Sequence, residues 1–162
     1  MFNTRNYKLV LFLFILLLFF IFPAKSQKCK DYKYKECRGY GPPYKYSQQS
    51  KSAYFEKGTK SDFYIVTYGG YEYNITICHE RNLKGTYFRI RENNPTKTLL
   101  YDSSTGEEEV LDTQFYVEET KKLIIEVIVP EGDKSLDEES YKKRHGCVGV
   151  LIEYHRRPTK GF

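Results

Sequence analysis

Apolar and polar residues alternate with a period of two along much of this chain, which is the pattern of strands with one buried face. The alternation is clearest in 61–80, SDFYIVTYGGYEYNITICHE, where two alternating runs flank a Gly-Gly break. These runs predict two paired strands, and we expect one face of the second run to point into a core. That face carries Tyr71, Tyr73, Ile75 and Ile77.

Further segments show the same alternation or a short apolar run and predict more strands. They are 53–56, 86–91, 99–102, 114–117, 122–129 and 147–155. The segment 122–129 is apolar on both faces, which is typical of a central strand or of one covered by another part of the chain. About eight short strands with polar turns predict an all-β, antiparallel β-sandwich, either Ig-like or jelly-roll-like.

One stretch carries helix signals instead. Ser135 and Glu138 fit a capping box, the residues from Lys142 to His145 are basic, and Gly146 suits a helix stop. These signals predict one short helix near 136–145. The segment has few apolar residues, so a solvated charged loop is the alternative.

The first 26 residues have the layout of an export signal. Arg5 and Lys8 supply positive charge before an unbroken apolar run at 9–22, and small residues follow at Ala24 and Ser26. The run is shorter than the roughly 20 residues that a spanning helix needs. We therefore predict cleavage after Ser26, with a retained membrane anchor as the alternative.

Removal of this leader changes the charge of the chain and defines its regions. The leader holds three basic residues and no acid, so the formal net charge falls from +5 to +2 on cleavage. That balance argues against nucleic acid or an anionic membrane as the partner. The predicted regions are a signal peptide at 1–26, an N-terminal arm at 27–52 that is rich in Tyr, Lys, Gly and Pro, and a β-sandwich domain at 53–162.

The four cysteines, Cys29, Cys37, Cys78 and Cys147, form an even set in an exported chain, which favours two disulfides. Among the three pairings we prefer Cys29 with Cys37, which closes a short loop. We then pair Cys78 with Cys147, because both lie out of phase with the core residues of their strands. A zinc site that adds His79 and His145 is disfavoured, since adjacent ligands on a strand point to opposite faces.

The motifs of common hydrolases are missing from the sequence, which contains neither G-x-S-x-G nor H-E-x-x-H. We therefore expect no enzyme activity and no cofactor. Acidic residues near 102–112 offer the oxygen ligands that calcium prefers, but acids on a hairpin are more often solvated, and we expect no metal. These acids are Asp102, Glu107, Glu108, Glu109 and Asp112.

Tyrosines interleaved with lysines are the most prominent feature of the N-terminal arm. Exposed tyrosine supplies flat, amphipathic contact area for proteins and sugars, so we predict that these residues bind a partner. The alternative is that they cover an open edge or the outer face of the sandwich. The alternation of Tyr and Lys at 31–37 also fits an edge strand. The five tyrosines are Tyr32, Tyr34, Tyr40, Tyr44 and Tyr46.

Asn74, Ile75 and Thr76 form a glycosylation acceptor pattern on the outward face of the predicted strand. The pattern has a meaning only in a eukaryotic source. The leader is instead of the kind found on Gram-negative envelope proteins.

Several segments resemble two kinds of secreted β-sandwich, the bacterial prepeptidase C-terminal domains and the GOLD-type domains. The similar segments are EKGTKSDFYIVTYGG, FRIRENNPTKTLLYDSS, LIIEVIVP and GCVGVLIEY. Such domains resemble carbohydrate-binding modules and usually accompany a larger protein. The resemblance implies a β-sandwich with binding or accessory work.

The sequence thus predicts an exported, non-catalytic binding or accessory module that acts on a protein or glycan partner in the cell envelope. We expect it in the periplasm, on the outer membrane surface or secreted. The alternative is a structural subunit of an envelope membrane complex, retained by an uncleaved leader.

Overall fold

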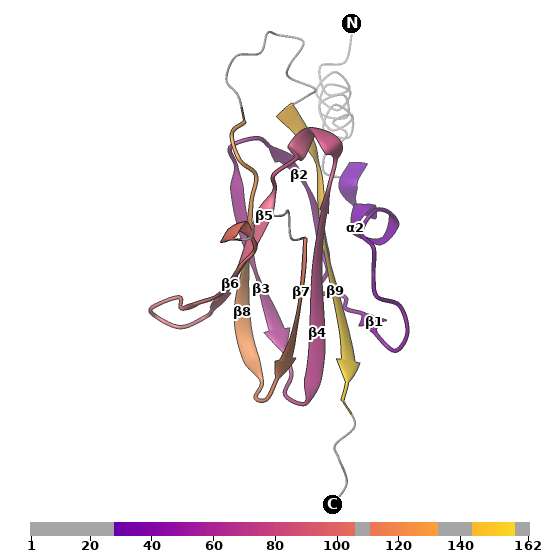
Figure 1. The fold of residues 1–162 in the computed structure, drawn as a ribbon, viewed down its shortest axis with the longest axis vertical. Coiled ribbons are helices and arrows are strands. Elements are labelled where there is room, and N and C mark those ends of the chain that lie inside the picture. Colours follow the sequence, from indigo (N-terminus) through magenta and orange to yellow (C-terminus); the bar gives the residue numbers. More distant parts are fainter. Residues whose placement is uncertain (1–27, 106–110, 133–143, 158–162) are drawn as a thin grey trace, which may run out of the picture.

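A computed structural model describes residues 28–105, 111–132 and 144–157 of the chain. Two antiparallel sheets pack face to face, and short helical turns are the only other regular elements in these ranges (Figure 1). The predicted all-β, antiparallel sandwich is therefore confirmed. The leader and nearly all of the predicted helix at 136–145 lie outside the described residues, and His145 begins a strand.

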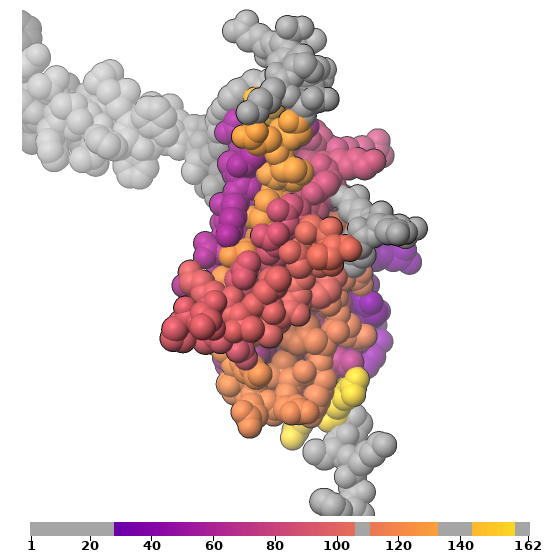
Figure 2. Space-filling view, turned by 60° about the vertical axis from the view of Figure 1, so that its left-hand side comes forward, coloured from indigo at the N-terminus to yellow at the C-terminus, as the bar shows by residue number. Residues whose placement is uncertain are grey.

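Sheet A contains β1 (Lys45–Tyr46) and β2 (Lys51–Glu56), which pair with successive parts of β9 (His145–Arg156), followed by β4 (Tyr71–His79) and β7 (Asp112–Val117). Sheet B has the order β3 (Lys60–Thr67), β8 (Lys121–Ile128), β5 (Tyr87–Glu92) and β6 (Leu99–Asp102). The hairpin of β5 and β6 stands out from the body of the sandwich (Figure 2). The short helical turns are α2 (Tyr32–Lys35), η2 (Arg81–Leu83) and η3 (Ser103–Thr105).

The two strands on either side of the Gly-Gly break do not pair with each other, which corrects one prediction. β3 lies in sheet B and β4 in sheet A, so the chain crosses between the sheets at this point. A Cβ on Gly69 would lie 2.5 Å from the carbonyl oxygen of Glu118, and Gly70 has a φ of +82°. Alternation alone places a residue on a face and does not specify the sheet to which its strand belongs.

The core fills the space between the sheets with the residues that the alternation assigned to it. Tyr73, Ile75 and Ile77 of β4 are buried, and they face apolar side chains from sheet B. β8 lies between β3 and β5, as its two apolar faces predicted, and Ile124 on its outer face is 2% exposed. The strand order thus explains why this strand is apolar on both faces.

The N-terminal arm crosses the outer face of sheet A. Its segment 31–37, which fits an edge strand by sequence, forms the short helix α2 instead. The Lys33 N–H donates to Ser52 Oγ at 2.9 Å, and a Cβ on Gly149 would lie 2.9 Å from Lys33 Cα. The arm therefore lies over β9 and adds to sheet A only through β1 and the start of β2. The predicted boundary between arm and domain, at 52/53, falls within β2.

The outer face of sheet B holds a buried carboxyl between two cations. Glu126 is 7% exposed, and it lies 2.8 Å from Lys60 Nζ and 3.1 Å from Arg91 Nε. Desolvation raises the pKa of Glu126, but the hydrogen bonds from Lys60 and Arg91 outweigh it and leave this pKa below the ordinary value of 4.5. Ionised Glu126 therefore stabilises the fold.

We expect the free energy of unfolding to fall as the pH drops below about 4.5, because protonation of Glu126 breaks both ion pairs. A carboxyl with a lowered folded pKa contributes stability above its unfolded pKa and loses it as the pH falls through the folded value. Urea unfolding between pH 3 and 7 measures this slope. Glu126→Gln should flatten it, whereas Glu118→Gln at an exposed turn should not, and equal slopes for all three proteins would contradict the assignment.

Candidate functional site

Two disulfides attach the arm to sheet A. Cys29 bonds to Cys147 with a Cα–Cα distance of 5.5 Å, and Cys37 bonds to Cys78 with a Cα–Cα distance of 5.0 Å. All four cysteines are thus oxidised, but the preferred pairing of Cys29 with Cys37 and of Cys78 with Cys147 is wrong. Each disulfide instead joins one arm residue to one strand of the sheet.

The register of β4 and β9 explains the correction. The two strands are neighbours, and Cys78 and Cys147 share the outer face as predicted, but the residue opposite Cys78 is Gly149. Cys147 is therefore in the diagonal position, where Cα atoms in adjacent strands are about 7–8 Å apart and beyond the usual reach of a disulfide. Each cysteine bonds instead to the arm that covers it.

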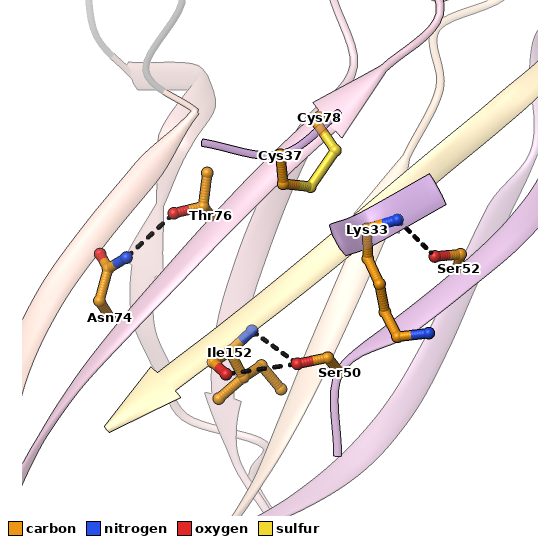
Figure 3. The surroundings of a disulfide bond; sticks show 8 residues. All are labelled: Lys33, Cys37, Ser50, Ser52, Asn74, Thr76, Cys78 and Ile152. Atoms are coloured by element: carbon orange, nitrogen blue, oxygen red, sulfur yellow. Dashed lines mark hydrogen bonds between the residues drawn. A yellow bond between two sulfur atoms is a disulfide. The ribbon is translucent and has the colours of Figure 1, made fainter. Parts of the chain in front are cut away.

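A close approach at Gly149 makes this covering possible. A Cβ at this position would lie 2.9 Å from Cys78 Sγ and 3.1 Å from Cys37 Sγ. Any side chain would push the disulfide and helix α2 away from the sheet. Figure 3 shows the Cys37–Cys78 disulfide beside α2, on the outer face of β4 and β9.

Polar side chains are buried between the arm and sheet A. Asn74 and Glu153 are both 0% exposed. Glu153 Oε2 accepts hydrogen bonds from Tyr40 N at 3.0 Å and from Asn74 Nδ2 at 3.1 Å, and Asn74 Nδ2 also donates to Thr76 Oγ1 at 3.0 Å. The bond between Asn74 and Thr76 is drawn in Figure 3. This network holds the arm against the sheet next to the disulfides.

The same network bears on the glycosylation pattern. Asn74 lies on the outward face of β4, as predicted, but the arm covers that face and both hydrogens of its amide are engaged. The folded structure therefore leaves no route for a glycan to Asn74.

Substitutions of Glu153 should separate its hydrogen bonds from its charge. Glu153→Leu leaves the Tyr40 N–H and the Asn74 amide unpaired, and we expect a loss of roughly 3 kcal/mol in unfolding free energy. Glu153→Gln keeps an oxygen acceptor at a buried carboxyl that pairs with no cation among the described residues, so its effect should stay within about 1 kcal/mol. Chemical denaturation measures both, with Glu118→Leu as the surface control. Equal losses for the two Glu153 variants would contradict this account.

Three of the five arm tyrosines make structural contacts at this face. The Tyr40 hydroxyl donates to Asp112 Oδ2 at 2.9 Å, and Tyr44 accepts from Gln114 Nε2, so both attach the arm to β7. Desolvation, followed by the nearby Glu80 and Glu36, raises the pKa of Tyr32 to about 12. These contacts agree with a covering role for this part of the arm.

The other two arm tyrosines face solvent. Tyr34 is 46% exposed and Tyr46 is 57% exposed, and their ring centroids are 5.7 Å apart. Lys33 Nζ lies 4.6 Å from the centre of the Tyr34 ring. Tyr40 is also 53% exposed although its hydroxyl bonds to Asp112, so the rings of Tyr34, Tyr40 and Tyr46 all remain accessible to a partner.

Tyr46 also lines a pocket that the sequence analysis missed, which we call the tyrosine pocket. Its volume is about 670 Å³. It lies at one end of the sandwich, where the β1–β2 loop, the β3–β4 crossing and the end of β9 meet. The lining residues are Tyr46, Ser47, Gln48, Gln49, Tyr68, Tyr71, Tyr73 and Tyr154.

The rings of this pocket are fixed by the fold at its floor and exposed at its rim. The Tyr73 hydroxyl accepts a hydrogen bond from Tyr68 N at 2.9 Å, and Tyr71 packs edge-on against Tyr154 at 5.9 Å. Tyr68 is 56% exposed. By alternation Tyr71, Tyr73 and Tyr154 fall on core-facing positions of their strands, but this pattern does not show that the sandwich stays open at this end. The available sequence signal was a tyrosine, Tyr68, directly before Gly69 and Gly70 at a turn, where a side chain is commonly exposed.

The histidines and acids considered as ligands or catalysts are engaged in other contacts. His79 Nδ1 is 3.0 Å from the Glu80 carbonyl oxygen, and His145 stacks on Tyr54 with ring centroids 5.6 Å apart. Asp102 Oδ2 bonds to Arg89 Nε at 2.6 Å, while its Oδ1 accepts from Ser104. Glu107, Glu108 and Glu109 lie outside the described residues. Within the described ranges, no cluster of three or more metal-ligating side chains is found.

Across residues 28–105, 111–132 and 144–157, no helix is both long and apolar enough to cross a membrane.

Comparison with solved structures finds a likeness of fold. The crystal structure of PliG from Aeromonas hydrophila, a periplasmic lysozyme inhibitor of g-type lysozyme, matches 73% of this chain and 93% of its own, with 9% identity and a TM-score of 0.46. No protein-family model matches the chain, and no curated protein sequence matches it significantly.

Proposed function

We propose that this chain is an exported, non-catalytic module that binds a protein partner at the tyrosine pocket. The observation that carries the proposal is the pocket's lining, which has five tyrosines and no charged side chain in a chain that is 29% charged. Interface cores in proteins are enriched in tyrosine and depleted of charge. Tyrosine also adds large contact area at a low entropic cost.

The geometry favours a protein over a glycan. The Tyr71 and Tyr154 rings meet at 71°, and the Tyr73 and Tyr154 rings meet at 38°, so the floor presents ring edges and not one flat platform. Rim residues Tyr46 and Tyr68 extend from two different segments of the chain. A partner side chain that enters between them would be enclosed on several sides.

The two disulfides support export, because such bonds persist in oxidising compartments such as the periplasm and the extracellular space. We place the module in the cell envelope or outside the cell. The alternative, a structural subunit of an envelope membrane complex, depends on the leader, which lies outside the described residues.

Photo-crosslinking in the native host tests the proposed site. With p-benzoylphenylalanine at position 68, we expect a discrete adduct that protease removes. The same group at Tyr116, which is 45% exposed on β7 at the opposite edge of sheet A, is the matched control and should give none. Once the partner has been captured and identified, Tyr68→Ala should weaken binding about tenfold or more, as truncation of an interface tyrosine that carries binding energy does.

The other outcomes have definite meanings. An adduct that resists protease and yields to glycosidases would replace the protein partner by a glycan. An adduct found in a membrane complex on chains that retain the leader would favour the structural subunit. Equal labelling at positions 68 and 116 would contradict the proposed site.

A further inference from the structure

A second opening, separate from the tyrosine pocket, lies between the edge strands β2 of sheet A and β3 of sheet B. Its volume is about 210 Å³, above the roughly 150 Å³ at which apolar cavities admit benzene. Ala53 and Ser61 are small and exposed although they lie on the inner faces of their strands. The remaining wall is largely apolar and includes Phe55, Phe63, Val127, Val148 and Val150.

The strand that borders this opening has a free edge. Thr59, directly before β3, accepts a hydrogen bond at its carbonyl oxygen from Val129 N, directly after β8, at 2.9 Å. Backbone groups alternate in direction along an edge strand, so the odd-numbered residues of β3 also direct their N–H and C=O groups to β8. The backbone groups of the even-numbered residues point out from the sheet. Among the described residues, only Gln49 bonds to any of them. These residues are Lys60, Asp62, Tyr64 and Val66.

Gln49 shows what this edge binds. Its side-chain Nε2 donates to Val66 O at 2.9 Å, and its Oε1 accepts from Val66 N at 2.8 Å. A side-chain amide therefore makes the two hydrogen bonds that a residue of an added antiparallel strand would make. An added strand would make the same pair of hydrogen bonds with the backbone of Tyr64, Asp62 and Lys60. Val66 is already bonded to Gln49, so the free edge ends there.

A second copy of this chain does not fit the edge. An antiparallel pairing of β3 with itself that is centred on Asp62 places two carboxylates directly opposite each other, which is destabilising. A shift by one outward residue toward Tyr64 brings Lys60 opposite Val66, whose backbone groups already bond to Gln49. The opposite shift pairs Lys60 with Asp62 but sets Tyr64 opposite Gly58, outside β3, so only these two outward residues of each copy pair. The charge at Asp62 favours instead a strand with a cationic residue at the opposite position.

We propose that β3 binds an extended peptide segment of another protein by strand addition, antiparallel to β3 from Tyr64 to Lys60. The residue opposite Asp62 is basic. The residues on either side of it, opposite Ser61 and Phe63, are aliphatic and fill the opening between the sheets. Main-chain hydrogen bonds supply affinity in such complexes, and the side chains that enter the pocket supply selectivity. This site is independent of the tyrosine pocket, and either can exist without the other.

The test uses the oxidised, folded protein and a fluorescent, end-capped peptide with the core sequence TVKIE. In this register Thr lies opposite Tyr64, Lys opposite Asp62 and Glu opposite Lys60. We expect saturable binding in fluorescence anisotropy. N-methylation of the Lys nitrogen removes a donor that faces β3 and should weaken binding about tenfold, whereas N-methylation of the Val nitrogen, which points away, should change it less than about threefold.

Two further measurements complete the test. Asp62→Lys should weaken TVKIE and strengthen TVEIE by about two- to fivefold each, as a swapped cross-strand charge pair predicts. Tyr68→Ala should leave peptide binding unchanged, because Tyr68 lies in the other pocket. Absence of saturable binding, an equal effect of the two N-methyl groups, or dimerisation of the protein through β3 would overturn the proposal.

Discussion

The attachment of the N-terminal arm to the outer face of sheet A is the constraint on which the rest of the structure depends. The Cys29–Cys147 and Cys37–Cys78 disulfides join residues 118 and 41 positions apart. Taken singly, bonds that close such loops stabilise a fold by about 5 and about 4 kcal/mol in the chain-entropy model. They hold α2 against β9 so closely that only glycine fits at position 149. The arm is thus a covering layer of the sandwich and buries the polar pair of Asn74 and Glu153.

The path of the arm also determines where the tyrosine pocket and the free edge of β3 lie. After it has crossed the outer face, the chain joins the edge of β9 as β1, leaves it at 47–50, and returns as β2. The Ser47 N–H donates to the Ile152 carbonyl, and Ile152 N donates to Ser50 Oγ (Figure 3). Gln49, between these two serines, reaches across to β3 in the other sheet. One four-residue loop therefore closes one end of the β3 edge and forms one wall of the tyrosine pocket.

Much of the fold is readable in the sequence, because alternation reports directly which strand face is buried. The strand predicted at 99–102 has the bounds of β6, and the inner face predicted for β4 places Tyr73, Ile75 and Ile77 in the core. Alternation does not encode which sheet a strand joins or how two strands are registered. The sequence therefore could not show that β3 and β4 lie in different sheets. Nor could it show that the residue opposite Cys78 is Gly149 and not Cys147.

The candidate sites were harder to predict for related reasons. Tyr40 and Tyr44 are indistinguishable by sequence from Tyr34 and Tyr46, and only the folded arm shows that the hydroxyls of the first two bond to side chains of β7. Tyr71, Tyr73 and Tyr154 carry a core pattern, yet they line a pocket because the sandwich is open at its end. The free edge of β3 follows from strand order, which no local pattern specifies.

The most direct test of this account is peptide mapping of the unreduced protein after trypsin digestion just below neutral pH with free thiols blocked, conditions under which trypsin still cleaves and thiol–disulfide exchange is suppressed. Lys30, Lys33 and Lys35 separate Cys29 from Cys37, so each disulfide gives a distinct linked pair of peptides. The account predicts one pair that contains Cys29 and Cys147 and another that contains Cys37 and Cys78. A peptide pair that links Cys29 to Cys37, or Cys78 to Cys147, would mean that the arm is not fastened across sheet A and would contradict the central claim.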